Sequence, residues 1–178
     1  KIKWEYVSLG IFIFAIGLAK KTLLGDPLTD FAQNAFDHAE DLSMVEAWYA
    51  SLSYVLSYYF DLSGYADMAI GIGKMFNINI PINFNSPYKA RNFSEYWKRW
   101  HISLSRFLEE YLFFTLALSG KFRGKRWWML TSLVLTMFLG GLWHGAAWTF
   151  AIWGLLHGIY LILQRILSPF YHKCILTL

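Results

Sequence analysis

The chain has 178 residues, of which 56% are hydrophobic, 20% are aromatic and only 16% are charged, and its formal net charge is +4. Water-soluble domains usually carry about a quarter charged residues, so this composition argues against an ordinary soluble domain. The positive charge does not indicate nucleic-acid binding, because the basic residues flank apolar runs and no RNA-binding motif accompanies them. The single cysteine, Cys174, excludes an internal disulfide and a cysteine-based metal site.

The N-terminal part predicts two hydrophobic helices joined by a polar segment. Residues 6–24 form the first apolar run, with Lys20 and Lys21 near its end. Residues 25–46 are rich in acidic groups and predict a turn followed by an amphipathic helix that lies on the surface. Residues 47–76 form the second long apolar run.

Two carboxylates interrupt this second run, Asp61 and Asp67, with Gly64 between them. Acidic groups at membrane depth are costly and usually face a bundle interior or an aqueous cavity. The alternative is that they lie near the interface, or at a helix break at Gly64. The residues alone leave both interpretations open.

A loop and an amphipathic helix follow. Residues 77–92 contain five Asn and two Pro, which predicts a loop. Residues 93–111 place apolar side chains on one helical face and charged ones on the other, and predict one in-plane amphipathic helix. We expect Asn92 or Ser94 to cap its start. We expect i,i+4 ion pairs between Glu95 and Arg99 and between Arg106 and Glu110, with His101 at the edge of the apolar face.

The next segment, from Trp127 to Gln164, contains no Asp, Glu, Lys or Arg over 38 residues. As one straight helix it would be about 57 Å long, nearly twice the thickness of a bilayer core. We therefore expect two membrane-embedded helices, residues 127–141 and 143–166. The whole chain predicts an all-α, polytopic transmembrane bundle with in-plane amphipathic helices.

The histidine most suited to chemistry is His144, which lies in this uncharged segment among Gly140, Gly141 and Gly145. A buried neutral imidazole can accept a proton near neutral pH, and glycines let a backbone or a ligand approach closely. The alternative is that His144 bonds a neighbouring helix while the glycines serve packing. His157 is thirteen residues further on and would face nearly the opposite way on one continuous helix, so we interpret it as a packing or polar-bridging residue.

Other functional templates are missing from the sequence. No pair of histidines has i,i+3 or i,i+4 spacing, and there is no HExxH, CxxC, GxSxG or P-loop motif, so we expect no metal site and no bound cofactor. His38 and His172 lie in polar or terminal contexts and carry no functional signal.

Two motifs resemble the membrane-bound O-acyltransferase family, in particular its bacterial alginate O-acetylation branch. They are WHISLSRF at residues 100–107 and LWHGAAW at residues 142–148, and the resemblance extends over residues 47–166. Family members are much longer, so we expect residues 1–178 to form part of the family's membrane domain. The branch commonly continues the first motif with Arg-Asp-Tyr, where this chain has Glu109-Glu110-Tyr111.

The resemblance implies catalytic roles for two histidines. His144 matches the family's signature catalytic residue, and we expect it to be the base. His101 matches the histidine of the other motif, and we expect it to orient the base, donate to the oxyanion or line the acyl channel. Asn83, Asn85 and Lys89 are candidates for the mouth of a tunnel.

The resemblance also implies the reaction and its setting. We expect a multi-pass protein of the bacterial inner membrane that moves acetyl groups from acetyl-CoA or another acyl thioester toward hydroxyls of an exported, alginate-like polysaccharide. Its expected partners are the lipid bilayer, the polysaccharide acceptor and periplasmic acetyltransferases, and not nucleic acid. One alternative is D-alanyl transfer to teichoic acid from a carrier-protein thioester. Another is a transport or structural subunit without chemistry, in which Asp61 and Asp67 would form an ion or proton path.

Overall fold

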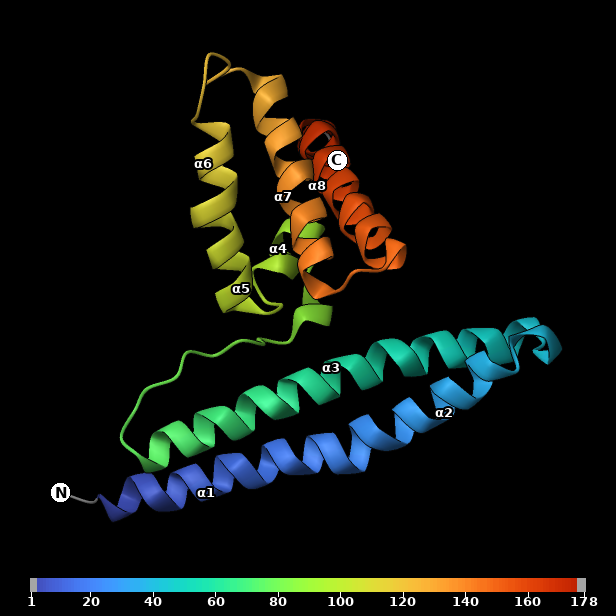
Figure 1. Ribbon diagram of the computed structural model, residues 1–178, viewed down its shortest axis with the longest axis vertical. Helices are drawn as coiled ribbons and strands as arrows, with labels where there is room; N and C mark the ends of the chain where they lie inside the picture. The colour runs from blue at the N-terminus through green and yellow to red at the C-terminus, as the bar shows by residue number, and fades with distance from the viewer. Residues whose placement is uncertain (1–2, 176–178) are drawn as a thin grey trace. The chain divides into compact units, whose positions relative to one another are not determined.

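The computed structural model describes residues 3–175, with side chains up to residue 168, so the side chains of His172 and Cys174 lie outside the described part. Every regular element within that range is helical and none is a strand, which confirms the predicted all-α class. The chain divides into an N-terminal unit, Lys1–Phe84, and a C-terminal unit, Asn85–Leu178. Figure 1 shows the helices of both units.

The N-terminal unit is a hairpin of two long helices. Its first arm consists of α1 (Trp4–Ala19), a π-helical stretch η1 (Lys20–Gly25) and α2 (Asp26–Asp37), which follow one another without a break. The predicted turn at residue 25 is therefore wrong. The wider π turn, in which the Asp26 N–H bonds to the Lys21 carbonyl five residues earlier, ends directly before Pro27. The N–H that proline lacks thus falls where the hydrogen-bond pattern already changes.

A short 3-10 turn, η2 (Ala39–Asp41), leads into the second arm, α3 (Met44–Met75). This helix begins before the predicted start at residue 47 because Ser43 and Glu46 form a capping box, in which each side chain bonds the other's backbone N–H. The helix does not break at Gly64.

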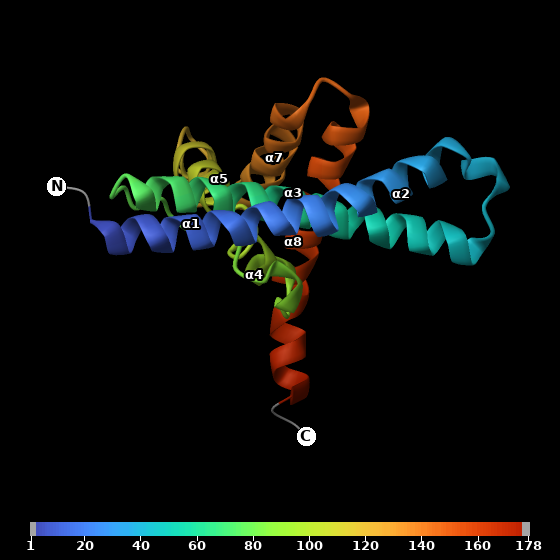
Figure 2. The same ribbon diagram turned by 90° about the horizontal axis from the view of Figure 1, so that it is seen from below.

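Glycines join α1 to α3 at two levels. Gly10 faces Gly71, and Gly17 faces Gly64 two helical turns further along. A Cβ atom added to Gly64 would lie 2.6 Å from the Gly17 carbonyl oxygen, so only glycine allows this backbone approach. The two helices run side by side in both Figure 1 and Figure 2.

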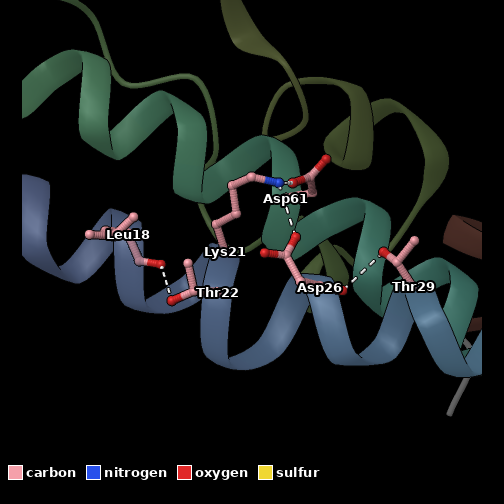
Figure 3. A network of polar contacts seen from close by, with 7 residues as sticks. Leu18, Lys21, Thr22, Asp26, Thr29 and Asp61 are labelled. Carbon is pink, nitrogen blue, oxygen red and sulfur yellow. Dashed lines mark hydrogen bonds and ion pairs between the residues drawn. The ribbon is translucent and has the colours of Figure 1, made fainter.

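The carboxylates of α3 lie opposite the two lysines of η1. Lys20 Nζ is 2.5 Å from Asp67 Oδ2, and the two side chains are 34% and 28% exposed. Lys21 Nζ is 2.5 Å from Asp61 Oδ1 and 3.0 Å from Asp26 Oδ1, as Figure 3 shows. Asp61 and Asp67 therefore form ion pairs between the arms of the hairpin.

The C-terminal unit begins with a short 3-10 turn in the predicted loop and then forms a series of helices. They are η3 (Pro87–Lys89), α4 (Phe93–Trp97), α5 (Ile102–Phe107), the π-helical η4 (Leu108–Phe113), α6 (Phe114–Ala117), α7 (Arg126–His144) and α8 (Trp148–Ile175).

The predicted single helix over 93–111 is wrong, because the chain breaks between α4 and α5 and then continues to Ala117. Asn92 caps α4, since its Oδ1 accepts from the Glu95 N–H, and Arg99 pairs with Glu95 at 2.7 Å, both as predicted. The expected pair of Arg106 with Glu110 is absent from the ion pairs of the described residues. This pair would cross from α5 into the π turn, where i,i+4 side chains no longer lie above one another.

The turn between α7 and α8 lies later than predicted, at residues 145–147, so His144 is the last residue of α7. Gly141 of α7 meets Gly154 of α8, and a Cβ on Gly154 would strike the Met137 carbonyl oxygen. The glycines therefore serve close packing of the two helices. Figure 1 shows α7 and α8 alongside each other.

Within the described part of the chain, two stretches are long and apolar enough to cross a membrane, Trp4–Asp37 and Trp148–Ser168. Many large apolar side chains on them are exposed, among them Ile11, Phe12 and Ile152. This surface is typical of helices that contact lipid or other membrane helices.

Candidate active site

His144 lies at the C-terminal end of α7, where the chain leaves the helix through Gly145 in an extended conformation. A Cβ on Gly145 would come within 2.6 Å of the Phe150 ring, so glycine lets the first turn of α8 approach the histidine. The His144 ring packs edge to face on Trp153, with ring centres 5.6 Å apart, and against Trp143 at 5.1 Å. The imidazole is thus held by indole rings from both helices.

His101 lies at the break between α4 and α5 and has a left-handed backbone, with φ 40° and ψ 58°. This conformation costs a non-glycine residue of the order of 1 kcal/mol, and such strain clusters at functional sites. The preceding residue, Trp100, is buried and stacks on Tyr96, which anchors the break. The sequence pattern missed the break because helical spacing of apolar residues continues across it.

A cavity of about 540 Å³ opens beside His101. Its lining is His101, Ser103, Leu104, Phe107, Leu108, Leu112, Leu139 and Trp143. Leu108 enters this wall beside Gly140, where a Cβ atom would lie 3.0 Å from its Cδ1. The π turn η4 and the C-terminal half of α7 therefore build an apolar cavity with an imidazole and a hydroxyl at its edge, as small-molecule sites commonly have.

The two predicted catalytic histidines are brought near each other. Burial lowers the pKa of His101, and the nearby His144 imidazole acts in the same direction. A lowered pKa keeps His101 neutral at physiological pH, so its ring carries one N–H donor and one acceptor nitrogen. The catalytic roles of both histidines stay predictions.

A second cavity, of about 370 Å³, lies between the start of α4 and α8. Its lining is Pro87, Tyr88, Ala90, Arg91, Asn92, Phe93, Tyr96 and His157. The Ser94 N–H donates to Gln164 Oε1 at 3.0 Å, and Gln164 Nε2 donates to Ser94 Oγ at 3.1 Å, which fixes α4 on α8. Asn85 and Lys89, expected at a tunnel mouth, line neither of these two cavities.

His144 and His157 do not share one continuous helix, since His144 ends α7 and His157 lies on α8, so the angle expected between them on a single helix does not apply. His157 is on the same face of α8 as Trp153, one turn later, with ring centres 4.7 Å apart. Trp153 therefore contacts both imidazoles. Indole rings at helical spacing looked like ordinary core or interface residues in the sequence, so Trp153 and Trp97 were not among the candidate site residues.

Asp61 and Asp67 belong to the N-terminal unit, where they pair with lysines. No cluster of three or more His, Cys, Asp or Glu side chains that could hold a metal ion occurs in the part of the chain that the structure describes. Glu109 and Glu110, which stand where the resemblance leads one to expect Arg-Asp, are exposed on η4.

Comparison with known proteins gives a consistent group of relatives. The sequence profile of the membrane-bound O-acyltransferase family matches residues 2–177. A peptidoglycan O-acetyltransferase of Helicobacter pylori is 54% identical over 94% of this chain and 31% of its own length. A probable alginate O-acetylase, AlgI, of Azotobacter vinelandii is 46% identical over 86% of this chain and 30% of its own length.

A more distant relative is the teichoic acid D-alanyltransferase of Bacillus subtilis, which is 31% identical over 88% of this chain and 42% of its own length. The chain thus spans about 30% of the length of the two O-acetylating relatives and less than half of the third.

Proposed function

Because the chain belongs to the membrane-bound O-acyltransferase family, we propose that the protein is an O-acyltransferase of the bacterial inner membrane. It moves acetyl groups from a cytoplasmic thioester, with acetyl-CoA as the simplest donor, toward hydroxyls of a cell-envelope polysaccharide. The observation that carries the proposal is the apolar cavity lined by His101 and by Trp143, whose ring packs on the His144 imidazole with ring centres 5.1 Å apart.

The apolar cavity beside His101 suits the thioester donor. Its walls of leucine, phenylalanine and tryptophan exclude water, which would otherwise hydrolyse the thioester. The two polar side chains in its lining, His101 and Ser103, are of the kinds that can donate a hydrogen bond to a carbonyl oxygen. A donor aimed at the developing oxyanion is commonly worth 10²–10³-fold in rate, to order of magnitude.

The transfer step needs one base and one oxyanion donor. The acceptor oxygen attacks the thioester carbonyl carbon while the neutral His144 imidazole takes the hydroxyl proton. His101 donates its ring N–H to the oxyanion of the tetrahedral intermediate. The carbon–sulfur bond then breaks, the sulfur leaves with the proton from His144, and the products are an ester and a free thiol.

Acetyl is favoured over D-alanyl as the transferred group by the relatives. The two relatives named for O-acetylation are 54% and 46% identical to this chain, whereas the D-alanyltransferase is 31% identical. The names of the two O-acetylating relatives also suggest the acceptor, so peptidoglycan and an alginate-like polymer are the first acceptors to test. Periplasmic acetyltransferases that complete the transfer remain part of the proposal.

The ion pairs of the N-terminal unit argue against the transport alternative. Both carboxylates expected to form a proton path are instead paired with lysines of the neighbouring helix. Carboxylates that join two helices in this way already have a structural role.

The test replaces His144 by Gln in the complete protein. Loss of the base is expected to lower polysaccharide O-acetylation about 10²–10⁴-fold, measured as alkali-released acetate, at an unchanged amount of membrane protein. The matched control is His38→Gln, since His38 is exposed and bonds only the Asn34 carbonyl one turn back. Retained acetylation in H144Q would contradict the proposed function.

A further inference from the structure

The indole Nε1 of Trp97 on α4 and the imidazole Nδ1 of His157 on α8 are buried, and neither has a hydrogen-bond partner among the described residues. Their rings meet edge to face, with centres 5.3 Å apart and planes at 82°. A buried polar group left without a partner costs about 1–3 kcal/mol, so natural proteins keep such pairs only where they have a use.

This pair lies one ring away from the proposed base. The Trp153 ring contacts Trp97 at 5.9 Å, His157 at 4.7 Å and His144 at 5.6 Å between ring centres. Trp153 is thus a ring neighbour of both the polar pair and His144. A substrate that contacts both must carry two polar groups on one rigid body.

One member of the pair, His157, is part of the lining of the second cavity. The lining also includes the aromatic residues Tyr88, Phe93 and Tyr96, together with Arg91. Phe93 is held in place by stacking on Tyr160 at 4.9 Å. Aromatic walls with a few polar groups bind ligands that have both an apolar face and polar edges.

The chemistry of the two atoms selects the ligand group. An indole N–H only donates, while imidazole Nδ1 accepts when the proton is on Nε2. A hydroxyl satisfies both at one oxygen, since it accepts from Trp97 and donates to His157. We propose that Trp97 and His157 bind one hydroxyl of the acyl acceptor, and so orient a second, more distant hydroxyl toward His144. This inference rests on the proposed function.

Trp97 and His157 are therefore binding residues for the acceptor, distinct from the cavity that suits the thioester. Each cavity then binds one of the two substrates, the donor beside His101 and the acceptor beside His157. Sugar rings fit the geometry, because their carbon faces pack on aromatic rings and their hydroxyls lie on rigid neighbouring carbons. A serine or threonine of a partner protein offers the same hydroxyl chemistry.

The test uses Trp97→Phe in the complete protein, which keeps the aromatic ring and removes only the N–H. Acetyl-CoA serves as the donor probe. De-O-acetylated peptidoglycan fragments and N-acetylserinamide serve as separate acceptor probes. We expect the KM for the acceptor to rise by about five- to tenfold, the loss of one net hydrogen bond, with the KM for acetyl-CoA and thioester hydrolysis without acceptor changed less than twofold.

The two acceptor probes identify the source of the hydroxyl. A rise in the KM for the peptidoglycan fragments assigns the subsite to a sugar. A rise in the KM for N-acetylserinamide assigns it to a hydroxyl amino acid. An unchanged KM for both acceptors, or an equal rise in the KM for acetyl-CoA, would overturn the inference. In the same assay H144Q abolishes transfer if the proposed function is right, so the two failures are distinguishable.

A matched control separates binding from stability. The indole N–H of Trp128 donates to the Leu116 carbonyl at 2.9 Å, so Trp128→Phe removes an N–H that has a partner within the fold. This variant is expected to lower the melting temperature and to leave the acceptor KM unchanged, the reverse of W97F. His157→Phe is expected to resemble W97F, while His157→Asn, which keeps a polar atom near the position of Nδ1, is expected to restore most of the acceptor affinity.

Discussion

The polar side chains of the two units differ in their surroundings. In the N-terminal unit the lysines of η1 and the carboxylates of α3 are joined to one another in ion pairs across a glycine-lined helix contact. In the C-terminal unit the imidazoles of His101, His144 and His157 lie beside cavities or among aromatic rings. Polar groups that pair within the fold stabilise it, whereas groups that face a cavity are available to a substrate.

The largest loss of stability is expected from substitutions where α1 contacts α3 in the N-terminal unit. Gly64→Leu is expected to lower the free energy of unfolding by more than about 3 kcal/mol, because even a Cβ would lie 2.6 Å from the Gly17 carbonyl oxygen and neither backbone can yield without separating the helices. The measurement is thermal or SDS-induced unfolding of the detergent-solubilised protein. The control is Tyr65→Leu, since Tyr65 is next in sequence and 70% exposed. Equal stability of the two variants would contradict the close contact.

A smaller effect is expected from breaking one ion pair. Lys20→Met leaves Asp67 without its partner and is expected to cost about 1–3 kcal/mol, below the range for fully buried pairs because both side chains are partly exposed. Adding Asp67→Asn should recover part of this loss, and a double-mutant cycle measures the coupling. Acetyl transfer per folded molecule should stay unchanged. A large loss of activity at normal stability would show that this pair takes part in function and would remove the contrast between the units.

The mildest expected effect concerns pH and tests the C-terminal unit. Burial lowers the pKa of His101 from its ordinary value of 6.5, so the folded protein binds fewer protons there than the unfolded chain. The stability that this provides is present above pH 6.5 and is lost as the pH falls through the lowered pKa. Acyl transfer should likewise stay constant down to pH 6.5 and decline only below it.

The check on this prediction is a pH series of kcat/KM and of melting temperature for the unmodified protein and for His101→Gln. The variant is expected to lose the part of the stability slope below pH 6.5 that His101 contributes. A fall in kcat/KM on the acid side with its midpoint above pH 6.5 would mean that His101 is not held in the neutral form.

Hydrophobic patterning predicted most of the helices because the 3.6-residue period and the absence of charge are local properties of the chain. It missed the capping box of Ser43 and Glu46, although that signal is local and readable. It placed a turn at Pro27 and a continuous helix through His101, and both were wrong. A π turn and a left-handed residue leave no periodic signature, since they depend on what packs against them.

The candidate site shows the same division. The sequence by itself determined the all-α class, the apolar character of the chain and the choice of His101 and His144, because composition and motifs are written in the residue types. Only the tertiary structure decided that α7 ends at His144, that Trp153 lies between two imidazoles and that Asp61 and Asp67 face lysines. These facts depend on which faces of two helices are in contact and on the register of one helix along the other. Glycine contacts such as Gly17–Gly64 and Gly141–Gly154 determine the face and the register, because they allow the two backbones to touch.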